Sequence, residues 1–356
     1  MQGGQGGISQ RKADHLDLAV NGDVAFRTTT TLFECVRFIH QALPELHADA
    51  IDTSLTLFGK KLRAPLIIAA MTGGVERAQL INRELAAIAE ARGYGFGLGS
   101  QRAMHLDASK TETYGVREVA PGALVLGNLG IVQARRMTTD EVRELVRRVG
   151  ADALCVHLNP AMEIVQPGGD RDFEGGVETL TRLVNELPVP VVAKETGCGL
   201  SARAAAQLKR AGVQHVDVSG AGGTSWVAVE MHRASGEERA TGEAFREWGI
   251  PTAASVAWMA SAGFESVIAT GGVLRGLDVA KAIALGATAG GIARPVLQAL
   301  TLGGREGAER YLDQVEAELR AAMLLVGAAN LGDLRKAPRI VTGELSDWLS
   351  QGTLAR

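Results

Sequence analysis

The strongest constraint on the fold is an alternation of short apolar runs with amphipathic segments, which begins near residue 65. Apolar runs separated by helical patterns are typical of parallel strands that are buried on both faces. We therefore predict eight strands, at Leu66–Met71, Gly95–Gly99, Ala123–Gly127, Ala153–Leu158, Pro190–Lys194, His215–Ser219, Ser266–Thr270 and Ala289–Ala293. Eight such units favour an α/β fold of the closed (β/α)8 barrel type.

The segments between these runs place apolar residues at helical spacing. Helices are predicted at Ala78–Ala91, Thr139–Val149, Val177–Leu187, Ala202–Ala211 and Asp278–Leu285. Pro251–Ala262 is also apolar, but proline suits the first turn of a helix, so this segment is predicted to be helical as well.

The sequence predicts one large domain that carries additional segments. Residues 1–8 are rich in Gly and Gln, which predicts a disordered N-terminus, and residues 9–64 are expected to form an extension that packs on the barrel. We expect this extension to include a short hairpin over the bottom of the barrel. Residues 65–356 then form the barrel and a C-terminal helical part, with a long helix over Arg305–Gly327.

A doubly wound open sheet is the rival fold. Such a sheet carries its phosphate-binding glycines after the first strand, as G-x-G-x-x-G with an acidic residue about 20 positions later. That arrangement is missing here. Polar and glycine-rich residues instead follow strand after strand, as expected when strand ends from the whole ring converge on one site.

Composition excludes several classes of protein. The formal net charge of -3 and the pI near 6.2 give no global basic field, which argues against a nucleic-acid partner. Cys35, Cys155 and Cys198 are widely spaced and no Cys-x-x-Cys pair occurs, so we expect reduced thiols in a cytoplasmic protein. The N-terminus lacks an apolar signal segment and no run approaches about 18 apolar residues, which disfavours secretion and membrane spanning.

Two glycine-rich segments suggest binding of an anion. Gly271-Gly272 follows the seventh strand and Ala293-Arg294 the eighth, where many barrels bind phosphate through backbone N–H groups. A tight turn is the alternative explanation for the double glycine. The run from Ser219 to Thr224 holds so much glycine that we expect a close approach to a ligand, with no return in packing.

Three charged positions attract interest. Lys194 ends an otherwise apolar strand, where it needs an anion, an electron-rich ring such as a flavin, or a salt bridge to Glu195 or a neighbouring strand. Glu163 follows the fourth strand and is either a magnesium ligand or a surface loop charge. Arg11-Lys12 is either a solvated basic stretch or part of an anion site.

Seven motifs in register resemble the type 2 isopentenyl-diphosphate isomerases. They run in order along nearly the whole chain: Arg11-Lys12-x-x-His15, Met71-Thr72-Gly73-Gly74, Gly97-Leu98-Gly99-Ser100-Gln101-Arg102, His157-Leu158-Asn159-Pro160, Gly169-Asp170-Arg171-Asp172-Phe173, Lys194-Glu195-x-Gly197-x-Gly199 and Asp217-x-Ser219-Gly220-x-Gly222-Gly223-Thr224-Ser225-Trp226.

The resemblance implies an enzyme that uses FMN, NADPH and Mg²⁺ to interconvert isopentenyl and dimethylallyl diphosphate. It implies FMN contacts from Met71, Thr72, Gly73, Gly74, Ser100, Asn128, Lys194, Ser219, Thr224, Gly272, Arg275, Ala293 and Arg294. Substrate contacts are expected from Arg11, Lys12, His15, Ser100, Gln101 and Arg102, and Mg²⁺ binding from Glu163. The catalytic positions are His157, Asn159, Met162 and Lys194, and a homotetramer or homo-octamer is expected.

Two positions depart from the family pattern. Met162 replaces a glutamine of the catalytic site, and a thioether cannot donate a hydrogen bond. The family has an arginine that binds phosphate two positions after the double glycine. This chain has Leu274 at that position and Arg275 directly after it, so the phosphate arginine is shifted or lost.

Three hypotheses follow from these departures. The chain is a working isomerase, a family member that binds FMN and a prenyl or diphosphate ligand but catalyses another reaction, or a flavin-binding protein without catalysis. A 2-hydroxy-acid oxidase ranks last, because no His-Gly-Gly-Arg pattern occurs.

Overall fold

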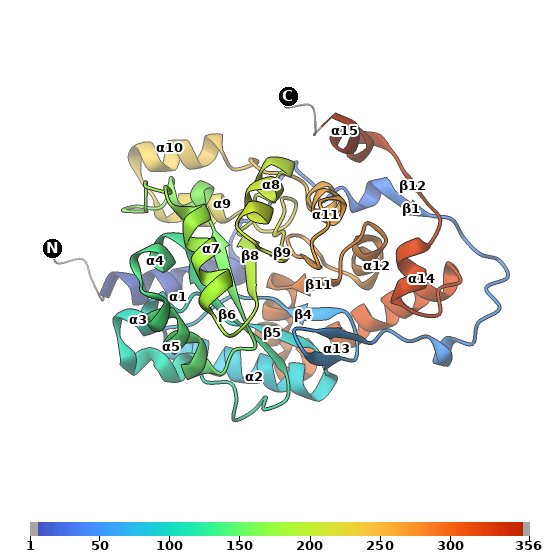
Figure 1. The fold of residues 1–356 in the computed structure, drawn as a ribbon, viewed down its shortest axis with the longest axis horizontal. Coiled ribbons are helices and arrows are strands. Elements are labelled where there is room, and N and C mark those ends of the chain that lie inside the picture. Colours follow the sequence, from blue (N-terminus) through green and yellow to red (C-terminus); the bar gives the residue numbers. More distant parts are fainter. Residues whose placement is uncertain (1–5, 352–356) are drawn as a thin grey trace.

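A closed parallel barrel of eight strands forms the centre of the protein (Figure 1). The computed structural model describes residues 6–351. Neighbouring strands pair in chain order and the last closes on the first: β4 (Leu66–Ile68), β5 (Gly95–Gly97), β6 (Leu124–Gly130), β7 (Ala153–Leu158), β8 (Val191–Glu195), β9 (His215–Asp217), β10 (Ser266–Ala269) and β11 (Ala289–Ile292). All eight predicted strands are present and the predicted fold class is confirmed.

The inward faces of the strands change character along the barrel axis. In the lower half they bury one apolar cluster, which includes Leu126, Cys155, Val192 and Ile268. Side chains alternate between the two faces of a strand, so the next inward position lies two residues further on. Those positions carry Asn128, His157, Lys194 and Thr270. The carboxyl end of the barrel is therefore polar where the other end is apolar.

Helices surround the barrel (Figure 1), and those predicted from the sequence are present with small changes in their bounds. They are α2 (Glu76–Arg92), α5 (Thr139–Val149), α7 (Gly176–Glu186), α8 (Ala202–Arg210), α11 (Thr252–Ser261) and α12 (Gly276–Ala284). Helix α5 shows why the bounds of the helices could be predicted from the sequence. A capping box of Thr138 and Glu141 starts it, and Gly150 ends it in the left-handed conformation.

The long C-terminal helix α13 (Arg294–Leu325) is broken at Gly304, whose φ of 60° and ψ of -162° are not helical. Its second part corresponds to the helix predicted from Arg305. Its first part begins directly after β11, so the N-terminus of α13 lies at the carboxyl end of the barrel.

The N-terminal extension covers both ends of the barrel. Strands β2 (Leu55–Leu57) and β3 (Lys60–Leu62) form the expected hairpin, turning through Phe58 and Gly59 with positive φ. Leu57 and Leu62 are buried in the apolar cluster at the bottom. Helix α1 (Gly6–Asn21) lies at the opposite, polar end, where several of its side chains line the cavity described below.

Residues 1–5, the larger part of the segment expected to be disordered, lie outside the described residues, whereas residues 6–8 belong to α1. A strand pair was not foreseen: β1 (Val36–Phe38) of the extension pairs antiparallel with β12 (Arg339–Val341) near the C-terminus. The remaining elements are short: η1 (Phe33–Cys35), η2 (Ala48–Ala50), α3 (Arg102–Leu106), η3 (Ala108–Tyr114), α4 (Ile131–Arg136), α6 (Pro160–Glu163), α9 (Trp226–Arg233), α10 (Gly236–Ala244), α14 (Leu331–Lys336) and α15 (Gly343–Gln351).

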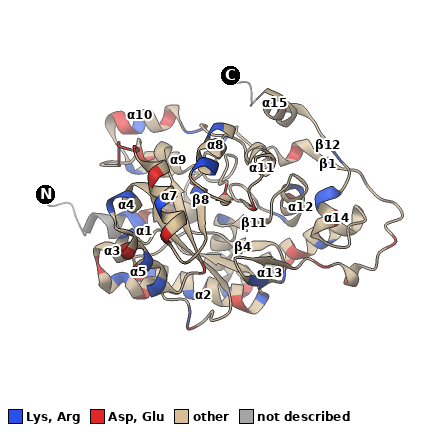
Figure 2. Ribbon diagram, in the orientation of Figure 1, with Lys and Arg blue, Asp and Glu red and all other residues tan. Residues whose placement is uncertain are grey.

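Acidic and basic residues alternate over the outer helices (Figure 2). Many of them form ion pairs one helical turn apart, such as Arg147 with Glu144. Within residues 6–351, none of the helices combines the length and the apolar character that crossing a membrane requires.

Candidate active site

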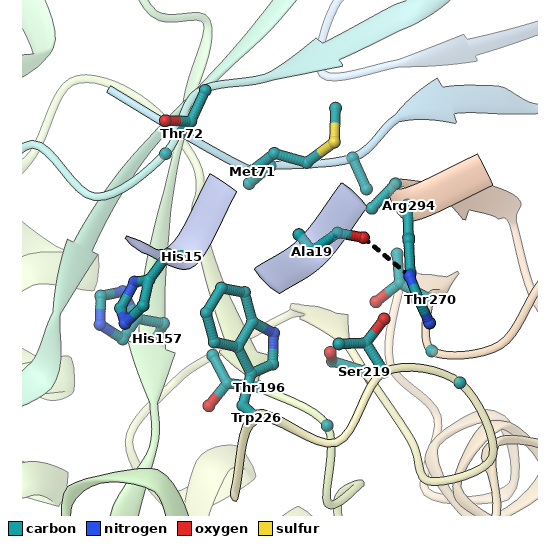
Figure 3. Close-up of a pocket in the computed structure, with 18 of the residues that line it drawn as sticks. His15, Ala19, Met71, Thr72, His157, Thr196, Ser219, Trp226, Thr270 and Arg294 are labelled. Carbon is teal, nitrogen blue, oxygen red and sulfur yellow. Dashed lines mark hydrogen bonds between the residues drawn. The ribbon is translucent and has the colours of Figure 1, made fainter. Parts of the chain in front are cut away.

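A cavity of about 410 Å³ opens at the carboxyl ends of the strands, beneath α1 (Figure 3). This is the end of a (β/α)8 barrel at which ligand sites are found. The cavity brings together nearly all the predicted site residues: Arg11, Lys12, His15, Met71, Thr72, Gly73, Ser100, Arg102, Asn128, His157, Asn159, Met162, Glu163, Lys194, Ser219, Thr224, Gly272, Ala293 and Arg294.

Lys194 lies on the floor of the cavity and has an internal counter-charge. Its Nζ lies 3.1 Å from Oδ2 of Asp217 on the adjacent strand β9, and it donates to the carbonyl of Glu195. Thr270 donates to the other oxygen of Asp217. The salt bridge to a neighbouring strand, one of the explanations for this lysine, is thus present. Lys194 also lines the cavity, where contact with an anion or a flavin stays a prediction.

His157 is held as a neutral ring with a known tautomer. Nδ2 of Asn128 donates to the carbonyl of Leu98, which leaves Oδ1 of Asn128 to accept from Nδ1 of His157 at 2.8 Å. Burial and the nearby cations Lys194, Lys12 and Arg102 lower the pKa of His157 to about 3. Nδ1 therefore carries the proton at neutral pH, and Nε2 can only accept a hydrogen bond.

Gln101 does not reach the cavity. It is fully buried, its amide donates to the carbonyl of Leu145, and its oxygen accepts from the backbone N–H of Asn128. The position of the side chain therefore does not support the expected substrate contact from Gln101. Its side chain orients strand β6, which carries Asn128 and so supports His157.

Glu163 lines the cavity as a buried carboxylate, and the alternative of a surface loop charge is wrong. Oε1 accepts from Asn159 at 2.9 Å, and Oε2 accepts from Gln166 and from the backbone N–H of Asp170. Within the described part of the chain no group of three or more His, Cys, Asp or Glu side chains could hold a metal ion. A metal bound here would find one carboxylate, Glu163, and would have to keep water or substrate oxygens for its other positions.

Met162 lies on the wall next to Asn159, with its Sδ 3.9 Å from Nδ2 of that residue. A thioether accepts a hydrogen bond weakly and donates none. The amide of Asn159 is accordingly directed to Glu163.

Three cations form one wall of the cavity: Arg11 and Lys12 from α1, and Arg102 at the start of α3. Burial and the charge of Arg102 lower the pKa of Arg11. Burial, Arg11 and Arg102 lower the pKa of Lys12 to about 7. Among residues 6–351, no carboxylate lies within ion-pair distance of any of the three. This wall is suited to an anion with several charges.

Helix α1 is attached to the barrel at two further points. Nε2 of His15 lies 2.7 Å from Oε1 of the fully buried Glu230, and the ring of His15 meets Trp226 edge-on. Arg294 donates to the carbonyls of Ala19 and Gly22 at the end of α1 (Figure 3). Arg294 thus lines the cavity while its guanidinium holds α1.

The glycine-rich loops have a packing explanation that the sequence did not reveal. A Cβ on Gly220 would meet Thr252, one on Gly222 would meet Thr31, and one on Gly223 would meet the backbone of Gly272. The loops after β9 and β10 thus lie in backbone contact with one another. The expectation of no packing return is wrong, although Gly222, Gly223, Gly271 and Gly272 do line the cavity.

Two other predicted residues do not line the cavity. Gly74 lies behind Gly73, where a Cβ would press on Ala103 and Lys12. Arg275 is the N-cap of α12, and Leu274 takes the position on the cavity wall. The expected FMN contact from Arg275 is therefore not supported by its position.

Several lining residues had no assigned role. They include Gln133, Gln166, Thr196, Trp226 and Thr270. Thr196, Trp226 and Thr270 lie inside or beside motifs at strand ends, so their positions in the sequence could have indicated that they line the site. Gln133 and Gln166 lie in helical and loop segments that gave none.

Comparison with known proteins agrees with this arrangement. The sequence profile of FMN-dependent dehydrogenases matches residues 5–164 and 170–341. Among solved structures, flavocytochrome b2 superposes with a TM-score of 0.66 at 19% identity, over 98% of this chain and 84% of that one. Mandelate oxidase superposes at 0.62 and 18% identity, over 95% and 98%. These two likenesses show the fold alone.

The fold and the family profile define an FMN-dependent enzyme of the (β/α)8 type. Closer relatives are proteins named isopentenyl-diphosphate delta-isomerase. The one from Methanothermobacter thermautotrophicus is 45% identical over 97% of this chain and 96% of its own length, and that from Halobacterium salinarum is 45% identical over 96% of both. The chain therefore belongs to the isopentenyl-diphosphate delta-isomerases of the FMN-dependent dehydrogenase family, as the motifs predicted.

Proposed function

We propose that the chain catalyses FMN-dependent isomerisation of isopentenyl diphosphate to dimethylallyl diphosphate. One observation carries the proposal beyond the family name. Arg11, Lys12 and Arg102 converge on one wall of the cavity without a carboxylate partner among the described residues. Three clustered cations without an ion-pair partner favour a ligand with the charge of a diphosphate.

The donor set of the cavity fits FMN. The N-terminus of α13 and the backbone of Gly271 and Gly272 form the end suited to a phosphate, with Ala293 and Arg294 beside it. Met71, Thr72, Gly73, Ser100, Asn128, Ser219 and Thr224 supply polar and backbone groups along the wall, and Lys194 lies on the floor. Reduced flavin supplies proton transfer to and from the substrate without net oxidation, and NADPH is the expected reductant.

Lys194 is placed to balance negative charge. Asp217 lies beside it as a counter-ion, and only 8% of Lys194 is exposed. A cation at this depth would stabilise negative charge on a reduced flavin.

The substrate would lie between this floor and α1. Arg11, Lys12 and Arg102 would bind the diphosphate, and Glu163 would be the carboxylate that holds Mg²⁺ beside it. His157 accepts a hydrogen bond at Nε2 and cannot serve as a proton donor at neutral pH, because its pKa is held near 3. Asn159 holds Glu163 in place.

A second candidate function rests on Met162 and Leu274. Both line the cavity as apolar groups where a glutamine and an arginine are expected. A family member with these changes could bind FMN and a prenyl diphosphate yet catalyse another reaction. A flavin-binding protein without catalysis would share the same cavity.

The test is an anaerobic assay of purified protein with FMN, NADPH, Mg²⁺ and isopentenyl diphosphate. Formation of dimethylallyl diphosphate supports the isomerase, and its complete absence from FMN-loaded protein rejects it. Arg102→Gln should raise the KM for isopentenyl diphosphate, whereas Arg203→Gln, at an exposed position of α8, should not. The cytoplasmic location and the homo-oligomeric state expected from the sequence stay predictions.

A further inference from the structure

Lys12 is held by a tyrosine that no sequence motif identified. Its Nζ donates to the hydroxyl of Tyr114 at 2.7 Å and to the carbonyl of Ser100 at 3.0 Å. Two of its three N–H groups are thus occupied and the third is left for the cavity, which Lys12 lines.

Tyr114 is itself fixed from several sides. It ends η3, is fully buried, and its hydroxyl donates to the carbonyl of Ser100 at 2.6 Å. Burial raises the pKa of Tyr114, so the hydroxyl stays protonated. Because its only hydrogen points to Ser100, its lone pairs are available to Lys12.

The loop that follows β4 shapes the space around this ring. A Cβ on Gly73 would overlap the Tyr114 ring, which explains a glycine at that position independently of any ligand. Thr113 accepts from the backbone N–H of Gly74 at 2.8 Å, and Asn82 donates to the carbonyls of Thr113 and Thr72. The contacts of Tyr114 are therefore built into the same loop that lines the cavity.

We propose that Tyr114 is a positioning residue for the diphosphate-binding wall, acting through the ammonium of Lys12. The inference rests on the proposed function for the identity of the anion. Without the hydroxyl, a buried ammonium loses one of its two acceptors and either leaves its place or gives up its proton. In both cases the wall loses a placed positive charge while the flavin end of the cavity keeps its contacts.

The variant Tyr114→Phe tests this, because it keeps the ring and removes only the hydroxyl. The matched control is Tyr94→Phe, at another fully buried tyrosine whose hydroxyl donates to Glu316 away from the cavity. Inorganic pyrophosphate is titrated calorimetrically into FMN-loaded protein, and FMN affinity and Tm are measured for every variant.

We expect Tyr114→Phe to weaken pyrophosphate binding about tenfold, with FMN affinity within twofold of the wild type. The KM for isopentenyl diphosphate should rise by a similar factor, with kcat changed less than threefold. In protein that also carries Lys12→Met, the same change should cost less than twofold.

Three outcomes overturn the inference: wild-type protein that does not bind pyrophosphate, a loss no larger than that of Tyr94→Phe, and an undiminished loss in the Lys12→Met protein. If Tyr114→Phe does not fold, the Lys12→Met protein decides instead, since it must then lose at least tenfold in pyrophosphate affinity. Wild-type protein that binds pyrophosphate but forms no dimethylallyl diphosphate would reject the proposed function and leave this inference standing.

Discussion

The two ends of the barrel are covered by one stretch of chain in two different ways. At the bottom, the hairpin β2–β3 inserts Leu57 and Leu62 among apolar side chains of the strands. At the top, α1 buries Leu16 and Val20 against Leu297 and adds a set of polar contacts that the bottom lacks, from Lys12 to Tyr114, from His15 to Glu230 and from Arg294 to the end of α1.

The two kinds of contact contribute differently to the stability of the fold and to ligand binding. Burial of apolar surface contributes to stability with little directional preference, so the bottom can be closed without leaving room for a ligand. Polar contacts are directional and leave charged groups at defined places. The top is consequently the end at which a change of one atom should alter binding more than stability.

The largest effect is expected at the bottom. Leu62→Ala removes a side chain that is 1% exposed and should lower the free energy of unfolding by about 2 to 5 kcal/mol. Chemical denaturation of FMN-loaded protein measures this, with the exposed neighbour Lys61→Ala as the control. Pyrophosphate affinity should stay within twofold. If the free energy of pyrophosphate binding fell as much as the free energy of unfolding, the two ends of the barrel would be energetically coupled.

The opposite pattern is expected at Lys12. Lys12→Met keeps most of the volume and removes the charge, so pyrophosphate affinity should fall roughly a hundredfold, or about 3 kcal/mol. The Tm should change by less than about 2 °C. Lys61→Met, on the bottom hairpin, is the matched control and should change neither quantity. Calorimetric titration and thermal melting measure both, and a large fall in Tm for Lys12→Met would contradict the separation.

A pH dependence of stability is expected from His157. The pKa of this residue is about 3 in the folded protein and about 6.5 in an unfolded chain, so between these values the unfolded state binds more protons. Stability should therefore be complete above pH 6.5 and fall as the pH drops, by about 1 kcal/mol per pH unit from this group.

His157→Gln should remove that slope in denaturation curves recorded from pH 7 to pH 5. His40→Gln, at an exposed position, should keep it. An unchanged slope in His157→Gln would show that the ring is not buried as a neutral group.

The smallest effect on stability is expected at Met162. Met162→Gln restores an amide next to Asn159 and should change the free energy of unfolding by less than about 1 kcal/mol, because the volumes are similar. Isomerase kcat should rise several-fold, measured as dimethylallyl diphosphate formed per flavin. A fall in kcat would indicate that the cavity is adapted to methionine.

The barrel could be predicted because its signals are local. Each strand is a short apolar run, and each inward polar residue lies two positions beyond an apolar one, as with Val192 and Lys194. The pairing of β1 with β12 could not, since nothing local links Val36–Phe38 to Arg339–Val341. The helical form of α1 was also not foreseen, although Arg11, Lys12 and His15 were expected at the site.

Within the site, the motifs predicted which residues lie near the cavity, but not in which direction each side chain points. Ser100, Gln101 and Arg102 are consecutive, yet Gln101 points into the packing between β6 and α5. Tyr114 was missed because its role depends on a residue about one hundred positions earlier. The glycines of the loops after β9 and β10 were read as space for a ligand, although contact between the loops requires them too.

The placing of the extension has a consequence for synthesis on the ribosome. Leu57 and Leu62 are made before every strand of the barrel that buries them, and β1 must wait for residues near the C-terminus before it can pair. Chains emerge N-terminus first, at about 5 to 20 residues per second, so this apolar hairpin is exposed for many seconds. The extension is thus translated before the barrel yet is among the last segments to find its native contacts.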